Sequence, residues 1–488
     1  RKESSAASDV YKRQARENWK EYVRRWMRHR NPYTGLTWAE DPALFCVNIA
    51  NEDPLCANWN LSESSRKCYL EYFAQWKKAG NPDNFTLFLS ELQGKCLDEL
   101  QAFLKDDLRM ETMVTSLNFQ MNSALTVMRD RFEAVDVHSY FDHPSFPETK
   151  WAAPYLFRQQ SAVGGAAKPL TDLMACRIFN KPFLVTEINF CNPNRYRAEY
   201  GPLIGGYAAL QEWSGIFRFT WTHSAWGVER GASGPPFMFD IAGDPLARLS
   251  DRIVIAMFRR GDVSPARQKF AQRFSANDLG VGDRNGDIAN FGILGLTGQV
   301  GAVVVPRIPK DVTVLGGSDD PEIKIPFGPV VSSTGELKID AGSRSFTVSS
   351  PRSESITLER GSLEAGRLSV HDVQGFQTVA AIALDEHPLA ASGSILVIHL
   401  TNVLPTGMTF EDETMQLIPD IGRLPILVRR LKAEVGIAAG ERPFRVTALN
   451  GNGKALGEVK GVLTDGVFRF TADPGCFPGG VMAYHLTR

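Results

Sequence analysis

The first half of the chain alternates between segments of helical periodicity and short, continuous apolar runs. From Glu17 onward, apolar residues recur at i, i+3, i+4 and i+7, which predicts an amphipathic helix. Continuous apolar runs are typical of strands that are buried on both faces of a parallel sheet. By these criteria strands are predicted at 44–50, 113–119, 134–140, 182–188 and 215–221, and helices at 87–104, 206–213 and 244–259. Strands that alternate with helices at this spacing predict βα units and a parallel sheet.

The pattern changes after about residue 259. Helical periodicity fades, and short β-rich segments such as GAVVVPRI, RSFTVSS and SILVIHLTNV lie between Gly, Asp and Asn turns. The Asn-Gly-Asn-Gly run at 450–453 is a strong hairpin signal. This half therefore predicts one or two antiparallel β-sandwiches. We expect a β-sandwich domain over 260–432 and a C-terminal β-strand module over 433–488, with a seam near 433–440.

Composition narrows the classes of function. Of 488 residues, 43% are hydrophobic, which is enough for packed cores in roughly three domains. The net charge of -1 argues against a general nucleic-acid or membrane-surface binder. No apolar run approaches the ~18 residues needed to span a bilayer. Residues 1–16 begin without Met and have no apolar core, so we expect a non-native leader rather than a signal peptide.

Polar and aromatic side chains stand at the ends of the predicted strands. In chain order they are Asn51, Glu52, His138, Tyr140, Glu187 and Trp221. In βα barrels the carboxyl ends of the strands meet at one face, which carries the active groups. Two glutamates on separate strand ends suit a retaining glycosidase, which needs an acid/base carboxyl and a nucleophilic carboxyl about 5–5.5 Å apart.

The neighbours of the two glutamates suit the same chemistry. A Tyr hydroxyl can orient the nucleophile, an Asn beside the acid can bond a sugar 2-hydroxyl, and a Trp face can pack on a pyranose. A lone Asn-Glu pair or a lone strand-end Glu is common turn chemistry, but the set together favours a functional site. His138 is equally compatible with a structural, buried histidine. The spacing of His138, Asp142 and His143 is not a zinc signature, so no metal is predicted.

The segment NPYTGLTWAEDPALFCVNIANEDPL, residues 31–55, resembles a clan of retaining (β/α)8 glycoside hydrolases that includes the cellulase and β-galactosidase families. In that clan an Asn-Glu pair ends the fourth strand, and a second Glu ends the seventh. Asn51-Glu52 and Glu187 match these positions. The sixth-strand position is matched by His138 and Tyr140, and the eighth-strand tryptophan by Trp221. The resemblance covers about 19–258.

The resemblance implies that residues 17–259 form strands four to eight of a TIM barrel, the C-terminal part of the fold, followed by the antiparallel β-sandwich region. Strands one to three are expected to precede Arg1. It also implies cleavage of a β-linked oligo- or polysaccharide by double displacement, with Glu52 as acid/base, Glu187 as nucleophile, and neither cofactor nor metal. Two alternatives stay open: a non-catalytic carbohydrate-binding protein with a relic barrel, and a transglycosylase that uses the same carboxylates.

Overall fold

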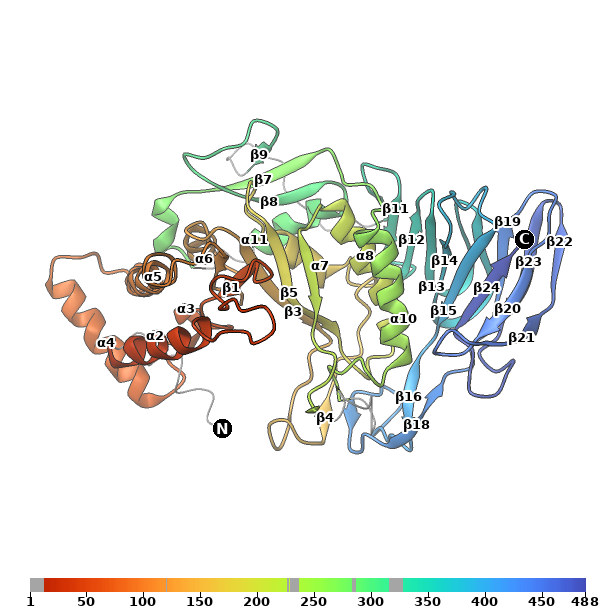
Figure 1. The fold of residues 1–488 in the computed structure, drawn as a ribbon, viewed down its shortest axis with the longest axis horizontal. Coiled ribbons are helices and arrows are strands. Elements are labelled where there is room, and N and C mark those ends of the chain that lie inside the picture. The colour runs from red at the N-terminus through yellow and green to blue at the C-terminus, as the bar shows by residue number, and fades with distance from the viewer. Residues whose placement is uncertain (1–12, 120, 226–227, 229–236, 283–286, 316–327) are drawn as a thin grey trace.

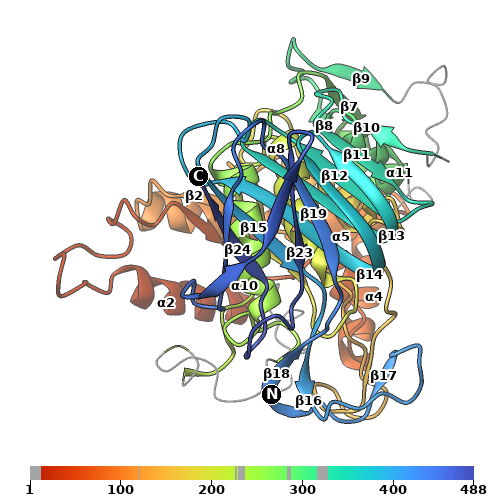
Figure 2. The ribbon, with the colours of Figure 1, turned by 90° about the vertical axis from the view of Figure 1, so that its right-hand side faces the viewer.

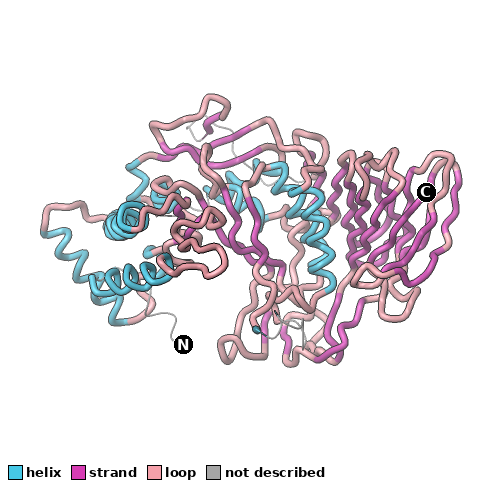
Figure 3. Tube along the Cα trace, viewed as in Figure 1, coloured by secondary structure: helices cyan, strands magenta, loops and turns pink. Residues whose placement is uncertain are grey.

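The computed structural model describes residues 13–119, 121–225, 228, 237–282, 287–315 and 328–488. Helices dominate the N-terminal end of the molecule and strands the C-terminal end, with a mixed region between them (Figures 1 and 3). Of the predicted leader, residues 1–12 lie outside the described residues, and helix α2 (Arg13–Met27) already begins within it. Among the described helices, none is both long enough and apolar enough to cross a membrane.

All five strands expected in the first half are present, although most are shorter than predicted. They are β1 (Cys46–Asn48), β2 (Met113–Thr115), β3 (Val135–Phe141), β5 (Phe183–Phe190) and β6 (Gly215–Arg218). β1 pairs with β2, β5 lies between β3 and β6, and every ladder is parallel. The two sheets adjoin, because the His138 N–H donates to the Asn118 carbonyl at 3.0 Å. The strand ends of both sheets therefore face one region.

Helices follow the strands along the chain. The principal ones are α3 (Leu55–Asn58), α4 (Glu63–Lys78), α5 (Phe85–Ala102), α6 (Ser123–Arg129), α7 (Lys168–Met174), α8 (Tyr200–Leu210) and α10 (Pro245–Val254). Side chains of Ser62, Asn84 and Asn122 accept backbone N–H bonds at three of their N-termini, which satisfies donors that a helix leaves unpaired. Helix α8 is buried along its whole length. A Cβ on Gly201 would lie 2.9 Å from the Ser250 carbonyl, so glycine permits the close approach of α8 and α10.

The described strands within 269–315 form a small parallel sheet, not the antiparallel arrangement predicted for this segment. Its order is β8 (Gln299–Val304), β7 (Lys269–Phe274), β9 (Thr313–Leu315), and helix α11 (Asp287–Gly292) lies between β7 and β8 along the chain. All six residues of β8 are buried. The continuous apolar run in GAVVVPRI is the pattern of a strand covered on both faces, and in this protein it indicates a parallel strand.

The C-terminal region is a twelve-stranded antiparallel sheet (Figure 2). Its strands are β10 (Val330–Val331), β11 (Leu337–Asp340), β12 (Ser345–Ser349), β13 (Ser353–Ala365), β14 (Leu368–Ala383), β15 (Ser394–Leu400), β19 (Ala433–Ala438), β20 (Arg445–Leu449), β21 (Ala455–Val459), β22 (Gly461–Thr464), β23 (Val467–Ala472) and β24 (Ala483–Thr487). The sheet branches at β14, which pairs with β15 along one part and with β19 along another. Residues of both branches share one apolar core.

The predicted seam near 433–440 falls on β19, which is paired on both sides. The last strand, β24, returns to pair with β15, so residues on both sides of the seam belong to one sheet. The hairpin predicted at 450–453 joins β20 to β21. Two small ladders stand apart from this sheet: β16 (Val403–Thr406) with β18 (Arg423–Val428), and β17 (Leu417–Ile418) with β4 (Tyr155–Leu156).

Glu199, at the N-terminal end of α8, makes folding stability depend on pH. Burial raises the pKa of its carboxyl to about 7, although Ser161 Oγ and the Ala162 and Val163 N–H groups donate to it. Between the ordinary glutamate pKa of 4.5 and about 7, the folded protein holds a proton that the unfolded chain has lost, so stability falls as pH rises through this window. In the wild type the free energy of unfolding should fall by about 3 kcal/mol across this window, and in Glu199→Gln we expect that fall to be absent.

The measurement is urea unfolding at several pH values between 4.5 and 7.5. Glu364→Gln, a change at an exposed glutamate of β13, is the matched control and should keep the wild-type slope. Equal slopes for wild type and Glu199→Gln would contradict this assignment.

Candidate active site

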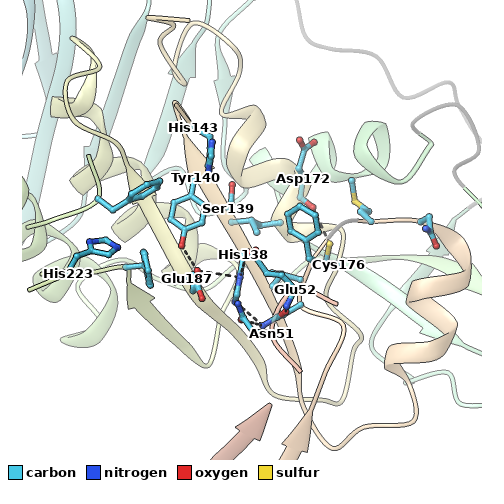
Figure 4. Close-up of a pocket in the computed structure, with 18 of the residues that line it drawn as sticks. Asn51, Glu52, His138, Ser139, Tyr140, His143, Asp172, Cys176, Glu187 and His223 are labelled. Atoms are coloured by element: carbon cyan, nitrogen blue, oxygen red, sulfur yellow. Dashed lines mark hydrogen bonds and ion pairs between the residues drawn. The ribbon is translucent and has the colours of Figure 1, made fainter. Parts of the chain in front are cut away.

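A cavity of about 1300 Å³ opens where the parallel strands end (Figure 4). Every strand of the two N-terminal parallel sheets supplies part of its lining, either from its last residues or from the loop that follows. The lining includes Asn51, Glu52, Asn118, His138, Tyr140, Glu187 and Phe219. The structure therefore brings five of the six sequence-predicted site residues together in one cavity, and Trp221 is the exception.

The two glutamates approach each other across His138. One oxygen of Glu52, one oxygen of Glu187 and a ring nitrogen of His138 all lie within 4.8 Å of one another. His138 Nδ1 is 2.8 Å from Glu52 Oε1 and 3.6 Å from Glu187 Oε2. One oxygen of Glu52 thus lies no more than 4.8 Å from one of Glu187, which suits the ~5–5.5 Å between the carboxyls of a retaining glycosidase better than the ~6.5–9.5 Å of an inverting one.

A β-bulge sets this geometry. Val137 of β3 is opposite Val185 of β5, yet the next residue, His138, is opposite Glu187, so Thr186 is the extra residue. A bulge re-aims the side chains that follow it and is common beside active sites. Here it places His138 and Glu187 side by side on adjacent strands.

Asn118 contacts His138, whose side chain is only 2% exposed, and Asp136 in turn accepts a bond from Asn118 Nδ2. Asn118 Oδ1 accepts the Glu52 N–H at 2.8 Å, and Asn118 Nδ2 lies 2.9 Å from His138 Nε2, which also lies 3.1 Å from Thr186 Oγ1. On the other side of the ring, His138 Nδ1 lies 2.8 Å from Glu52 Oε1, and an Nδ1–H donates to this oxygen when Glu52 is a carboxylate. Asp136 is fully buried and accepts bonds from side chains on β1, β2 and β5, namely Asn48, Thr115 and Thr186. This carboxylate ties the strands together beneath the site.

Sequence reasoning missed Asn118 and Asp136. Asn118 carried the same signal as the predicted residues, since it is a polar side chain at the end of an apolar run. Asp136 also carried one, because a carboxylate within the apolar segment 134–140 requires internal partners when it is buried. Asn118 contacts His138 directly, and Asp136 contacts Asn118 and Thr186 beneath it.

Tyr140 donates its hydroxyl hydrogen to Glu187 Oε2. Burial, together with this bond, raises the pKa of Tyr140 far above its ordinary value, so the hydroxyl remains a donor across the working pH range. A donor on one carboxylate oxygen holds Glu187 in one orientation and leaves its other oxygen for chemistry.

We expect Tyr140→Phe to lower kcat about 10- to 100-fold, which is the effect of one lost hydrogen bond to a charged group. Steady-state kinetics with a glycoside that the wild type hydrolyses would measure the ratio of the two kcat values. Tyr155→Phe is the matched control, because Tyr155 is buried nearby but does not line the cavity. Equal kcat values for Tyr140→Phe and wild type would contradict a role for the hydroxyl.

The run Asn51-Glu52-Asp53 divides its side chains between two environments. Asn51 and Glu52 line the cavity, and Glu52 adopts a left-handed backbone conformation with φ 50°. Asp53 is buried instead, accepts a bond from Asn58 Nδ2 at 3.1 Å, and does not line the cavity. Burial raises the pKa of Asp53 to about 6. Asp53 therefore stabilises the turn, while its two predecessors face the cavity.

Aromatic side chains make up much of the remaining cavity wall. They are Phe119, Trp151, Phe219, Phe237 and Phe239, with His143 and His223 beside them. Trp221, predicted as a sugar platform, is 48% exposed and is not among the described residues of the lining. Strand β6 ends at Arg218, three residues before the predicted end, and Phe219 occupies the wall position expected of Trp221.

Three donor atoms within 4.8 Å also have the spacing of a metal site. In this arrangement His138 Nδ1 is engaged with Glu52 Oε1 at 2.8 Å, and an Nδ1–H there donates to the carboxylate. A ligand nitrogen would have to give up that proton.

Comparisons with known proteins return a distant relation only. No protein-family model and no curated protein matches the chain. The crystal structure of a glycoside hydrolase family 5 mannosidase from Rhizomucor miehei is similar, with a TM-score of 0.31 and 14% sequence identity over 51% of this chain. A mutant of that mannosidase in complex with mannosyl-fructose gives a TM-score of 0.32 at the same identity and coverage. The match spans 60% of the length of each of those chains, and it concerns the fold alone.

Proposed function

We propose that this protein is a retaining glycoside hydrolase that cleaves a β-linked glycan, built on strands four to eight of a TIM barrel and a β-sandwich. The observation that carries the proposal is the approach of Glu52 and Glu187 to within 4.8 Å through His138. Two carboxyl groups at this separation, from different strands and inside one cavity, suit double displacement.

In the first step Glu187 attacks the anomeric carbon while Glu52 gives its proton to the leaving glycosidic oxygen. The bond from carbon to that oxygen breaks, and a glycosyl ester on Glu187 forms. In the second step Glu52 takes a proton from water, the water oxygen attacks the same carbon, and Glu187 leaves as a carboxylate. Each step inverts the anomeric centre, so the product keeps the substrate's configuration.

The exposed fractions of the two glutamate side chains match this division of roles. The Glu187 side chain is 19% exposed and is held by Tyr140, as a fixed nucleophile requires. The Glu52 side chain is 36% exposed, as suits a group that must exchange its proton with incoming water. We assign Asn51 to the sugar 2-hydroxyl and the Phe219 face to the apolar side of the ring.

The direct test is to incubate the full chain with a panel of cellotriose and mannotriose, measuring both binding and release of reducing sugar. We expect release of reducing sugar. NMR should show that the first-formed product has the retained anomeric configuration. Binding without release would favour a non-catalytic carbohydrate-binding protein, and sugar transfer to an added acceptor would favour a transglycosylase. A product of inverted configuration would refute double displacement.

A further inference from the structure

A segment of the C-terminal β region, residues 408–421, reaches the loop that follows β3, and we call it the C-terminal arm. Its strand β17 pairs with β4, which sets Ile418 opposite Tyr155. The Phe157 N–H donates to the Gln416 carbonyl at 2.9 Å and continues this ladder. In Figure 1, β4 lies beside β16 and β18 at the foot of the view. The arm is thus bonded through the backbone to a loop of the first half of the chain.

A buried glutamine joins the same arm to the strand ends. Gln159 is 4% exposed, donates from Nε2 to the Met415 carbonyl at 2.9 Å, and accepts the Arg195 N–H at Oε1, also at 2.9 Å. Its own N–H donates to Asp142 Oδ2 at 2.6 Å. Asp142 directly follows β3 and precedes His143, which lines the cavity. One side chain therefore links the arm to the loops that leave β3 and β5.

An apolar cluster continues from the arm to the aromatic wall of the cavity. The arm contributes Met408, Phe410, Ile418 and Ile421 to this cluster, and the cavity lining contributes Tyr140, Phe219, Phe237 and Phe239. The ring of Tyr155 is 5.9 Å from that of Phe146, which is 4.7 Å from that of Trp151, another residue of the wall. Because protein interiors are close-packed, loss of a side chain from such a cluster displaces its neighbours.

We propose that the C-terminal arm positions the aromatic wall of the cavity, with Ile418 as the positioning residue. The inference rests on the proposed function in one respect, since it takes this wall to contact the sugar. No residue of the C-terminal β region is in the described lining of the cavity, so the arm acts through the residues that it holds. The C-terminal β region is then needed for substrate binding as well as for stability.

The test compares Ile418→Ala with Ile395→Ala. Both isoleucines are fully buried in the C-terminal β region, but Ile395, on β15, belongs to the core of the antiparallel sheet. Each change leaves a cavity, so both should lower the unfolding midpoint. On whichever of cellotriose and mannotriose the wild type hydrolyses, Ile418→Ala should raise KM about tenfold and keep kcat within about threefold. Ile395→Ala should keep KM, because a smaller folded fraction lowers kcat alone.

Hydrogen exchange measured by mass spectrometry follows the wall without turnover. Peptides spanning 145–157 should exchange faster in Ile418→Ala than in the wild type or in Ile395→Ala, since the Phe157 N–H donates to the arm itself. All three proteins are compared well below their unfolding midpoints. If Ile418→Ala does not fold, Ile418→Val and Ile395→Val form the same pair with a smaller cavity.

Unchanged exchange over 145–157 in Ile418→Ala would overturn the inference. Faster exchange with an unchanged KM would also overturn it, because the arm would then hold the loop without positioning the wall. Both outcomes leave the proposed function intact. If the wild type binds a trisaccharide but does not hydrolyse it, the proposed function fails and Kd replaces KM. Binding that Ile418→Ala weakens and Ile395→Ala keeps would then support the arm, and no binding to the wild type would overturn both.

Discussion

Glu187→Ala is expected to lower kcat by roughly 10⁴-fold or more, the scale on which enzymes lose rate when the covalent nucleophile is removed. Glu187 is the carboxylate that forms the glycosyl ester, and the described lining of the cavity has Asp172 as its only further carboxylate, already paired with Lys168. The measurement is kcat on an activated aryl glycoside of whichever sugar the wild type accepts.

Azide gives this prediction a signature that misfolding cannot imitate. In Glu187→Ala the removed side chain leaves room for azide to attack the anomeric carbon directly. One displacement replaces two, so the glycosyl azide formed has inverted configuration. Glu148→Ala, at an exposed loop glutamate, should keep wild-type kcat and give no azide product. Full activity in Glu187→Ala would end the assignment of the nucleophile.

Hydrophobic patterning predicts the parallel strands of the first half well, because a strand covered on both faces needs a continuous apolar run. The same rule applied to GAVVVPRI would have indicated a parallel strand, and β8 is one. Hairpins are equally local, and the Asn-Gly run at 450–453 identified one. The pairing of β24 with β15 joins residues far apart in the chain, so no local pattern could reveal that the sheet continues across 433–440.

In the candidate site, too, local features could be predicted from the sequence and long-range ones could not. Strand-end position is visible in the sequence, and it led to Asn51, Glu52, His138, Tyr140 and Glu187. Register is not visible, and register decides which side chains meet. The bulge at Thr186 sets His138 opposite Glu187, and the early end of β6 gives the wall position to Phe219 rather than Trp221. Asn118 was missed because its role depends on both Glu52 and His138, which come from different strands.

The second large effect is expected when Glu52 is replaced. The loss of kcat in that variant should depend on the leaving group, and this dependence distinguishes an acid from a nucleophile. Glu52→Ala should lower kcat about 10²- to 10⁴-fold on substrates with poor leaving groups, which need a proton in the first step. A dinitrophenyl glycoside needs no such proton, so its glycosyl ester should still form and accumulate as a burst. The second step is then slow, because no base activates water.

Azide again reports the role, with the opposite stereochemistry. It needs no general base, so in Glu52→Ala it should speed breakdown of the ester on Glu187 and give a glycosyl azide of retained configuration. Glu111→Ala, at an exposed glutamate before β2, serves as the matched control. Since the carboxyls of Glu52 and Glu187 lie within 4.8 Å, loss of either one perturbs the same local charge, and the configuration of the azide product together with the dependence on the leaving group separates their roles. An inverted product from Glu52→Ala would exchange the two assignments, and equal losses on dinitrophenyl and methyl glycosides would show that Glu52 is not the acid.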